Sequence, residues 1–448
     1  MNWKAWPAVA TLLCVSAGGA SAQTFDLIGA QFYEPIAGSY TPHHARSVAL
    51  GGAYTTMVQD ASALWYNPAA LARIGHTEIQ TEVDYNRVEG ESLDLTASPA
   101  APPPTVDSTS ALLTATRLGS AYLAIPLKGG ASDWALGMGM AVVHNMDRVL
   151  VGDLAFAPGD FVDVLDSTTA EEIHDYEFSD DQRGVVRAWQ FGAGGKLSPH
   201  VMVGATGVYY YGTLDFTSRT TFSGLRFEGS NPAIPVRWDI STTSRETMRG
   251  WGGHASFLWQ PGPMLAIGGI LRSPVTYTID TDRLVTETRD LGTPTQYTEA
   301  TTRKLKVPLT VTAGASLGLG GLRVTGDASY TDWSQLEYTD SFLSQYNDSL
   351  RLFYADELAV GVGAELAMFQ RAISFRGGIR YATVPYEDYL VVDDRLTYSA
   401  GIGFVFDRVM ALDVGASLSE WRGSNPVWGF DERYTRARVL VTAAYRFN

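Results

Sequence analysis

The sequence predicts an all-β fold: a transmembrane antiparallel β-barrel of about fourteen strands, with a partly helical N-terminal plug inside its lumen. Three observations lead to this prediction. From about residue 76 onward, apolar and polar residues alternate with a period of two over long segments, as in strands that have one wet face. The connections between these segments alternate between very short turns and long polar stretches. The first part of the chain, in contrast, has short apolar stretches without this alternation.

The composition narrows the class of protein. The chain has 448 residues, of which 45% are hydrophobic and 18% are charged, and its formal net charge is −15. This apolar content excludes a disordered or fibrous chain. The acidic balance argues against nucleic acid as a partner, because phosphate binding requires a basic surface. Beyond the N-terminus no apolar run approaches the roughly 20 residues that a helix needs to cross a bilayer, which excludes a helical membrane protein.

Residues 1–22 have the layout of a cleaved secretory signal peptide. Lys4 precedes an apolar stretch, which ends in Ala-Ser-Ala, the small residues that precede a cleavage site. Cys14 is the only cysteine and lies inside this stretch, so we expect the exported chain to have no disulfide. We therefore divide the chain into the signal peptide, an N-terminal hatch or plug at 23–75, and a transmembrane barrel at 76–448.

The alternation is clearest in the last segment of the chain. Val439, Val441 and Tyr445 fall on one face of the expected strand, whereas Arg438 and Thr442 fall on the other. About 10 residues tilted near 40° cross an apolar band about 25 Å tall, and an even number of strands with short turns on one side is typical of bacterial outer-membrane barrels. We place the fourteen strands at 76–88, 116–128, 132–146, 183–197, 199–217, 247–260, 262–280, 303–319, 321–337, 353–369, 370–384, 394–407, 408–422 and 432–447, with long acidic loops at 147–182 and 281–302.

A plug is the expected role of the leading segment. A barrel of this strand number is wider than its own side chains can fill, so without a plug it would leak solutes. The segment contains the motif Asn67, Pro68, Ala69, which we assign to the hatch. The alternative is that this motif merely ends a helix or shapes a turn, as Asn-Pro often does.

These stretches together resemble the long-chain fatty acid and hydrophobic compound transporter family of the outer membrane (FadL/TodX type, OMPP1). The residues at 51–54 (Gly-Gly-Ala-Tyr), at 60–62 (Asp-Ala-Ser) and the Asn-Pro-Ala motif are similar to the family's hatch. Stretches at 251–274, 330–335 and 376–395 are similar to its later strands, in the same order.

The resemblance implies passive uptake of hydrophobic small molecules, such as long-chain fatty acids or hydrocarbons, across the outer membrane of a Gram-negative-type bacterium. It implies a monomer in contact with outer-membrane lipids, without a cofactor and without a metal. In that family apolar molecules, detergents included, bind first near the outer face; a hatch rearrangement then lets them leave sideways beside a kinked third strand. By this resemblance the kinked strand is 134–143, where Gly137 and Gly139 would permit a bend.

The head-group site departs from the family's pattern. Fatty acid transporters of the family hold the ligand's carboxylate with basic lumenal residues, whereas the corresponding stretches 208–214 and 275–279 contain no Lys or Arg. An uncompensated carboxylate in an apolar pocket is costly, so either another base serves or the ligand is uncharged. The candidate ligand-binding residues are Arg187, Tyr209, Tyr211, Arg272 and Tyr277.

Several features have a less specific interpretation. The tyrosines at 209–211 are more typical of an interfacial girdle with one lumenal ring. His43 and His44 lack a neighbouring ligand residue, which favours a surface position over a metal site. Interior arginines, Arg376 among them, are expected to pair with Asp413 and similar carboxylates.

Catalysis has little support in the sequence. No Gly-x-Ser-x-Gly elbow, phosphate-binding loop or His-Glu-x-x-His motif is present, and we expect no enzymatic activity. A barrel hydrolase assembled from distant Ser, His and Asp residues is the enzymatic alternative. Two non-enzymatic alternatives to hydrophobic uptake are a barrel scaffold or shuttle for secreted proteins and a general porin.

Overall fold

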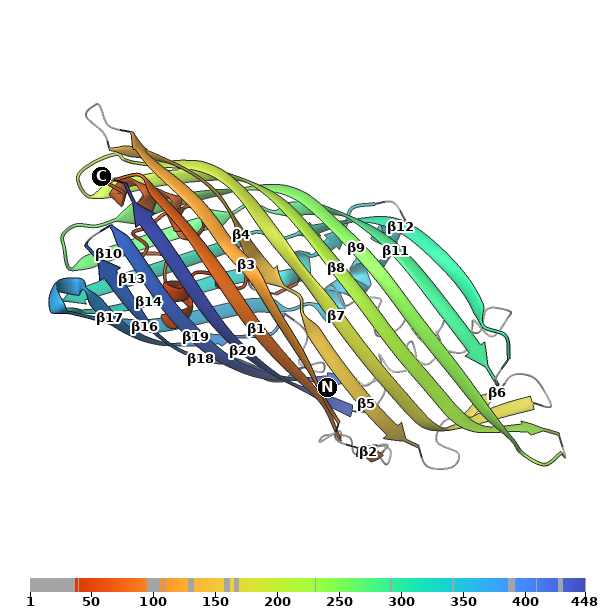
Figure 1. The fold of residues 1–448 in the computed structure, drawn as a ribbon. Coiled ribbons are helices and arrows are strands. Elements are labelled where there is room, and N and C mark those ends of the chain that lie inside the picture. Colours follow the sequence, from red (N-terminus) through yellow and green to blue (C-terminus); the bar gives the residue numbers. More distant parts are fainter. Residues whose placement is uncertain are drawn as a thin grey trace.

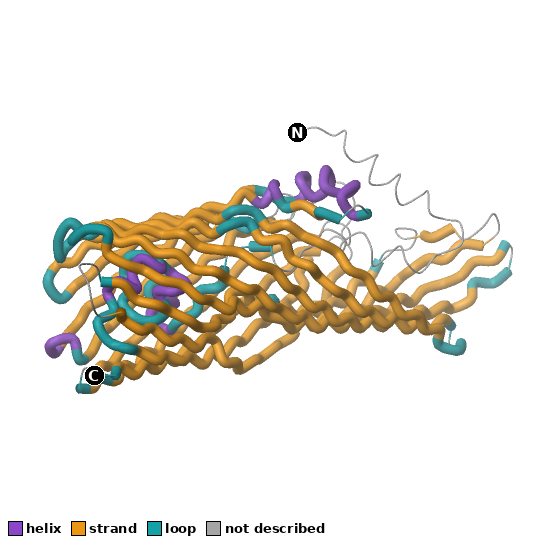
Figure 2. Tube along the Cα trace, turned by 90° about the horizontal axis from the view of Figure 1, so that it is seen from above, coloured by secondary structure: helices purple, strands orange, loops and turns teal. Residues whose placement is uncertain are grey.

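The chain forms one closed antiparallel barrel of 14 strands with the N-terminal segment inside it (Figures 1 and 2). This confirms the predicted fold class. The expected signal peptide, together with the first part of the expected hatch, lies outside the described residues. The computed structural model describes residues 37–38, 40–94, 105–107, 109–127, 133–156, 162–164, 169–229, 231–290, 292–340, 342–385, 391–407, 409–425 and 430–447.

Short helices and long strands follow one another along the chain. Among the described residues no helix is long and apolar enough to cross a bilayer. The helical elements are α3 (Ala45–Ala49), α4 (Ala63–Tyr66), η1 (Pro68–Arg73), η2 (Trp333–Gln335), η3 (Leu343–Tyr346), α5 (Asn347–Phe353) and η4 (Phe369–Arg371). The strands are β1 (Glu78–Asp94), β2 (Thr105–Asp107), β3 (Ser110–Leu127), β4 (Trp134–Asn145), β5 (Arg148–Ala155), β6 (Val162–Val164), β7 (Thr169–Lys196), β8 (Val201–Glu228), β9 (Ile234–Trp259), β10 (Leu265–Arg272), β11 (Val275–Arg289), β12 (Thr295–Val307), β13 (Thr310–Leu319), β14 (Leu322–Asp332), β15 (Glu337–Tyr338), β16 (Asp356–Met368), β17 (Ile373–Ala382), β18 (Val391–Phe406), β19 (Met410–Asn425) and β20 (Phe430–Arg446).

The barrel closes between its first and last strands. β1 and β20 pair along their whole length, from Glu78 opposite Arg446 to Asp94 opposite Phe430. Figure 1 shows the C-terminus and the red N-terminal helices at the same end of the barrel, which we call the hatch end. A tight turn at Gly320 joins β13 to β14, and the glycine has a φ of 68° there, a value that favours glycine.

The last strand has the predicted two faces. Val439 and Tyr445 are 41% and 46% exposed on the outward face, whereas Arg438 and Thr442 are buried on the lumenal face. An apolar outer surface with a polar lumen is the pattern of a transmembrane β-barrel.

Several strands are longer than the sequence analysis predicted. β7 and β8 have 28 residues each and β9 has 26. They project beyond the other strands at the end opposite the hatch, which we call the far end (Figure 1). The predictions of long acidic loops at 147–182 and 281–302 are therefore wrong, because much of both stretches is strand. Beyond the apolar band the outward face of a strand is polar, as at Asp175 and Glu177 of β7, and a register shift between Ile173 and Asp175 interrupts the alternation that identifies strands.

Two predicted strands are each interrupted by a proline. The predicted strand 262–280 is divided into β10 and β11 around Pro274, and the predicted strand 303–319 is divided into β12 and β13 around Pro308. The two breaks are at the same level, because Arg272 pairs with Thr310 on one side and Val275 pairs with Val307 on the other. Proline lacks the N–H that a central strand donates.

The hatch packs against the wall through apolar side chains and through bare backbone. Tyr54 and Trp65 are buried in the main hydrophobic cluster, together with side chains of the surrounding strands. Glycines of the wall let the hatch backbone approach closely: a Cβ on Gly204 would lie 2.3 Å from the carbonyl carbon of Pro68, and one on Gly378 would lie 2.3 Å from the amide nitrogen of Gly51. Glycine is therefore required at these contacts.

Carboxylates of the wall also hold the hatch. Asp327 accepts hydrogen bonds from the backbone N–H groups of Tyr54 and Thr55, each at 2.8 Å. Glu365 pairs with hatch residue Arg46 at 2.8 Å and with Arg376 at 2.7 Å. Breaking a buried ion pair from one side costs about 3–5 kcal/mol, so these contacts keep the hatch in place.

The expected ion pair between Arg376 and Asp413 is present, with Nη1 and Oδ1 2.5 Å apart. The guanidinium of Arg376 also contacts Glu365, which pairs with the hatch residue Arg46. Arg376 therefore belongs to the same ion-pair network as Arg46.

Replacing Gly204 with alanine should displace the hatch without unfolding the barrel. The new Cβ would clash with the backbone of Pro68, and such overpacking costs about 1–3 kcal/mol. We expect an unchanged heat-modifiable shift in electrophoresis and faster cleavage of the hatch in limited proteolysis.

The matched control is Gly207→Ala on the same strand, because the nearest atom to its Cβ would be the carbonyl oxygen of Phe191 at 3.9 Å. Equal protease resistance in the two variants would contradict this account of the packing.

Candidate functional site

The Asn67, Pro68, Ala69 motif joins the hatch to the barrel wall. Asn67 is buried; its Nδ2 donates to the carbonyl oxygens of Thr55 at 3.0 Å and of Phe257 at 3.2 Å. Its Oδ1 accepts from the N–H of Ala69 at 3.2 Å, which caps η1, and Pro68 is the first residue of that helix. The motif thus shapes a turn and also binds β9.

An aromatic cluster with an arginine lies where the hatch meets the lumen. The rings of hatch residues Tyr40 and Trp65 have centroids 5.1 Å apart. The guanidinium of Arg272, at the end of β10, lies 5.4 Å from the Tyr40 ring and 5.0 Å from the Trp65 ring. These distances are those of cation–π contacts.

Side chains of three further wall positions complete this group. His254 on β9 lies with its ring 4.9 Å from that of Trp65, and its Nε2 is 3.2 Å from the hydroxyl of Tyr210. Tyr210 in turn packs against Tyr277, with centroids 5.7 Å apart. We call these six residues the hatch cluster: Tyr40, Trp65, Tyr210, His254, Arg272 and Tyr277.

Arg272 is buried without a carboxylate partner among the described residues. Its Nη2 donates to the carbonyl oxygen of Trp65 and its Nη1 to the hydroxyl of Thr312, both at a long 3.3 Å. Neither its Nε nor the Nδ1 of His254 has a hydrogen-bond partner. Buried polar atoms are normally satisfied, so the hatch cluster retains unused capacity to bind a polar group.

Three of the five predicted ligand residues do not belong to this cluster. Tyr211 is 37% exposed and Tyr209 stacks on the outward-facing Trp251, so both lie on the lipid side of β8. Arg187 pairs across strands with Tyr211 and shares the outward face of β7 with Trp189. We correct these three assignments, because strand alternation places Tyr210 in the lumen instead. Arg272 and Tyr277 do face the lumen.

The predicted lateral gate lies near an irregularity in the wall. Gly137 and Gly139 are in β4, but both pair regularly with β3 and β7. The register shifts further along, between Val142 and His144. A gating role for the glycines stays a prediction, and the departure from regular pairing begins three residues after Gly139.

A second aromatic cluster lines the lumen toward the far end. We call it the far cluster; its buried members are Leu150, Leu154, Ile173, Tyr176, Phe178, Phe222 and Tyr434. Trp238 and Trp421 pack against it, with Arg289 5.5 Å from the Trp238 ring and Arg395 4.3 Å from the Trp421 ring. The lumen therefore has two aromatic regions.

The two histidines predicted at the surface are buried, which corrects that prediction. The Nε2 of His43 is 2.8 Å from the hydroxyl of Tyr122, and the Nδ1 of His44 accepts from the N–H of Arg46 at 3.2 Å. Burial lowers the pKa of His43 well below its usual range, with a smaller effect from His44. His43 therefore connects the hatch to β3, whereas His44 packs on Tyr54 inside the hatch.

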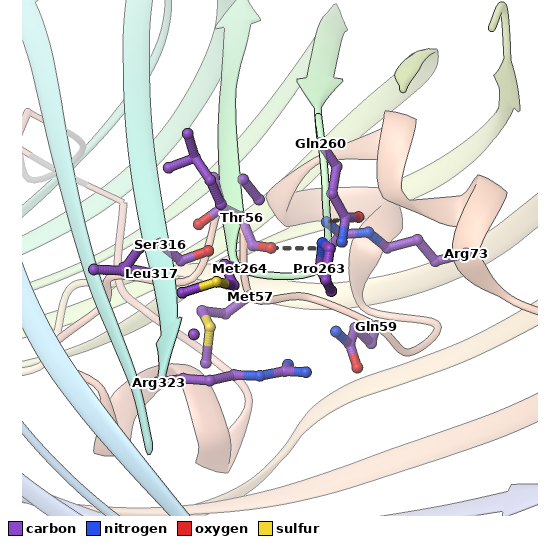
Figure 3. Close-up of a pocket in the computed structure, with 13 residues that line it drawn as sticks. Thr56, Met57, Gln59, Arg73, Gln260, Pro263, Met264, Ser316, Leu317 and Arg323 are labelled. Atoms are coloured by element: carbon purple, nitrogen blue, oxygen red, sulfur yellow. Dashed lines mark hydrogen bonds between the residues drawn. The ribbon is translucent and has the colours of Figure 1, made fainter. Parts of the chain in front are cut away.

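A small crevice at the hatch end separates hatch from wall (Figure 3). Its volume is about 30 Å³, far below the roughly 300 Å³ at which small-molecule pockets begin. Figure 3 shows Arg73 and Arg323 on opposite sides of it. Arg73 donates to the carbonyl oxygens of Thr56 and Val58 and to the side chain of Gln260. The crevice is too small and too polar for a hydrophobic ligand.

The fold and these clusters define a class of protein: a barrel closed by its own N-terminal hatch, with a lumen that is aromatic at two levels. Solved structures of this architecture are similar to the chain. They include the toluene transporter TodX of P. putida (14% identity, TM-score 0.62, 91% of this chain and 99% of that one) and a Pseudomonas aeruginosa FadL homologue (15% identity, TM-score 0.58, 92% and 100%). The monoaromatic hydrocarbon channel CymD aligns at 13% identity with a TM-score of 0.55 over 90% and 97%.

At these identities the likeness establishes the fold alone. No family model matches the sequence, and no curated protein matches it either. The hatch-cluster residues that the sequence analysis did not name as ligand candidates are Tyr40, Trp65, Tyr210 and His254. The local pattern gives little signal for Tyr210 and His254, because Tyr210 stands between two other tyrosines and His254 stands between Gly253 and Ala255.

Replacing Asn67 with alanine should weaken the attachment of the hatch. The variant loses both Nδ2 hydrogen bonds and the cap of η1, which together contribute about 1–3 kcal/mol. We expect faster hydrogen exchange at the hatch amides, with the exchange of the strand amides unchanged. Gln59→Ala, at an exposed hatch position, is the control, and equal exchange in both variants would be the contrary result.

Proposed function

We propose that this protein is a passive outer-membrane channel for the uptake of hydrophobic small molecules. The observation that carries the proposal is the hatch cluster: aromatic rings from the hatch and from the wall meet around a buried arginine. Such a site offers apolar surface together with a few polar groups, the usual make-up of a small-molecule site. The hatch end would face the periplasm and the far end the exterior.

The arrangement of the lumen supports a transport route with two binding sites, the far cluster and the hatch cluster. The far cluster would capture an apolar molecule from outside. Between the two clusters lies a polar belt that includes Arg148, paired with Glu432 at 2.8 Å, and Arg436, which donates to the backbone of Asp147. Uptake would then run down the concentration gradient without an energy source, because nothing in the route requires one.

The ligand would enter the hatch cluster by separating its rings. Tyr40 is the partly buried member, and it contacts Trp65, Arg272 and His144. It belongs to the hatch, near the beginning of the described chain. Its displacement is therefore the simplest way to make room, and it converts binding into a movement of the hatch.

The names of the similar structures favour the same substrate class. TodX and CymD are described as a toluene transporter and a monoaromatic hydrocarbon channel. We propose hydrocarbons and long-chain fatty acids as the candidates, with Arg272 as the residue that would receive a carboxylate. We further propose that the protein acts without enzymatic activity, and as a monomer surrounded by outer-membrane lipid.

Binding at the hatch cluster can be tested with Trp65→Ala. We expect the purified barrel in lipid nanodiscs to bind naphthalene in calorimetric titrations, and the variant to bind about tenfold more weakly, a loss of about 1.4 kcal/mol. Trp251→Ala is the control, because Trp251 is 73% exposed on the outward face.

The proposed function fails if the wild-type barrel binds no aromatic hydrocarbon and no fatty acid from a panel, and if cells lacking the protein take up these compounds at the normal rate.

The substrate class can be resolved with Arg272→Met. Charge-assisted hydrogen bonds contribute about 1.5–3 kcal/mol, so oleate affinity should fall about tenfold or more if Arg272 holds its carboxylate. Naphthalene affinity should change by less than about threefold. Equal effects on both ligands would remove the fatty acid from the proposal and leave uncharged hydrocarbons as the substrate class.

A further inference from the structure

The barrel wall contains a stretch in which β3 separates from the chain that follows it in the wall. β3 pairs with β4 only from Ser120 to Leu127, although β3 pairs with β1 as far as Ser110. Beyond Ser120 the chain on the other side continues as β5, whose described partners are β7 and β2. We call this break in backbone pairing, between residues 111–119 of β3 and residues 142–152, the lateral seam.

Both strands beside the seam have irregular pairing at its edge nearer the hatch end. In β4 the register shifts between Val142 and His144, and in β3 the residue Gly119 is left out of the pairing with β1. β5 then bends into the lumen and packs on the inner face of β1, where a Cβ on Gly90 would lie 1.8 Å from the carbonyl oxygen of Val149. The seam is thus formed by an inward kink of one strand.

An ion pair between Arg117 and Asp147 spans the lateral seam. Asp147, in the turn between β4 and β5, accepts two hydrogen bonds from Arg117 of β3, at 2.5 and 2.7 Å. The Asp147 side chain is fully buried, and it also accepts from Asn86 of β1 at 3.0 Å and from the N–H of Gly184 at 3.2 Å. Among the described residues Asp147 is the only carboxylate paired with Arg117.

The turn that carries Asp147 is also bound to the hatch. The N–H of Thr41 donates to the carbonyl oxygen of Val143 at 2.7 Å, and the N–H of Asn145 donates to the hydroxyl of Thr41 at 3.2 Å. Asn145 in turn accepts from the N–H of Asp147 at 3.0 Å. Thr41 follows Tyr40, so contacts run without interruption from the hatch cluster to the ion pair.

We infer that Arg117 and Asp147 form a clasp that holds the lateral seam shut, and that displacement of Tyr40 by a ligand loosens it through Thr41 and Asn145. This inference rests on the proposed function, and it adds the lateral seam as the place where the ligand leaves the barrel. A bidentate pair with one buried partner has two well-defined states, closed and broken, since an intermediate geometry would leave a buried charge unpaired. Such an element is what converts ligand binding into an opening of the wall.

The test replaces the ion pair by a covalent link. The double variant Arg117→Cys/Asp147→Cys can be joined with a short bis-maleimide, because the only natural cysteine lies in the expected signal peptide. We expect the linked protein to bind naphthalene as the unlinked one does, while cells expressing it take up naphthalene about tenfold more slowly.

The control is Arg245→Cys/Asp215→Cys, joined in the same way. That pair also forms a hydrogen bond, with Nε and Oδ1 2.7 Å apart, but its members are direct cross-strand partners on β8 and β9, so linking them restrains nothing new. Equal uptake by the linked and unlinked clasp variant would overturn the inference while leaving the proposed function intact. Loss of naphthalene binding in the wild-type protein would instead count against the proposed function.

A second variant does not depend on cross-linking. Arg117→Met leaves Asp147 with Asn86 and Gly184 as donors but frees β3 from it. We expect naphthalene uptake to be about twofold faster or more, with binding unchanged, because the closed state loses its strongest contact across the seam. An unchanged or slower rate in the folded variant would also overturn the inference.

Discussion

The structure depends on one constraint: inside a hydrocarbon layer every backbone N–H and C=O must find a partner within the protein. Closure between β1 and β20 meets it for the wall as a whole. At two departures from regular pairing, individual hydrogen bonds replace those of the ladder. Near the prolines Pro274 and Pro308, the N–H of Ser273 bonds to Gly253, and at the kink the carbonyl oxygen of Val143 accepts from the hatch. The hatch therefore fills the lumen and also completes the wall.

A second constraint follows from the size of the barrel. The side chains of a 14-stranded barrel cannot fill its lumen. The lumen therefore contains a plug as well as the polar side chains of the wall. Wall carboxylates meet this demand by binding the hatch, as Asp327 does with two backbone N–H groups and Glu365 does with Arg46. The aromatic hatch cluster contains one cation, Arg272. Among the described residues this arginine has no carboxylate partner.

Much of the fold was predictable from sequence, because period-two alternation is a direct record of a wall with lipid on one side. The last strand shows this, with Val439 outside and Arg438 inside. The prediction failed where that contrast is absent. In the outer part of β7 the outward face is acidic and the inward face carries buried aromatics such as Tyr176 and Phe178, so the pattern of a lipid-facing strand is missing. The tyrosines at 209–211 give no parity signal, because all three side chains are alike. The kink beside Val143 and the burial of His43 depend on hatch contacts that no local pattern records.

The glycine contacts between wall and hatch have a consequence for how the hatch can move. At Gly204 and Gly378 the backbone of the wall contacts the backbone of the hatch directly. Because no side chain lies between them, a change of rotamer cannot make room for a small displacement of the hatch. The hatch is therefore held by direct backbone contact with the wall at these positions. Departure from these contacts is an all-or-none event for a whole turn of chain, which suits a two-position switch better than a gradually widening pore.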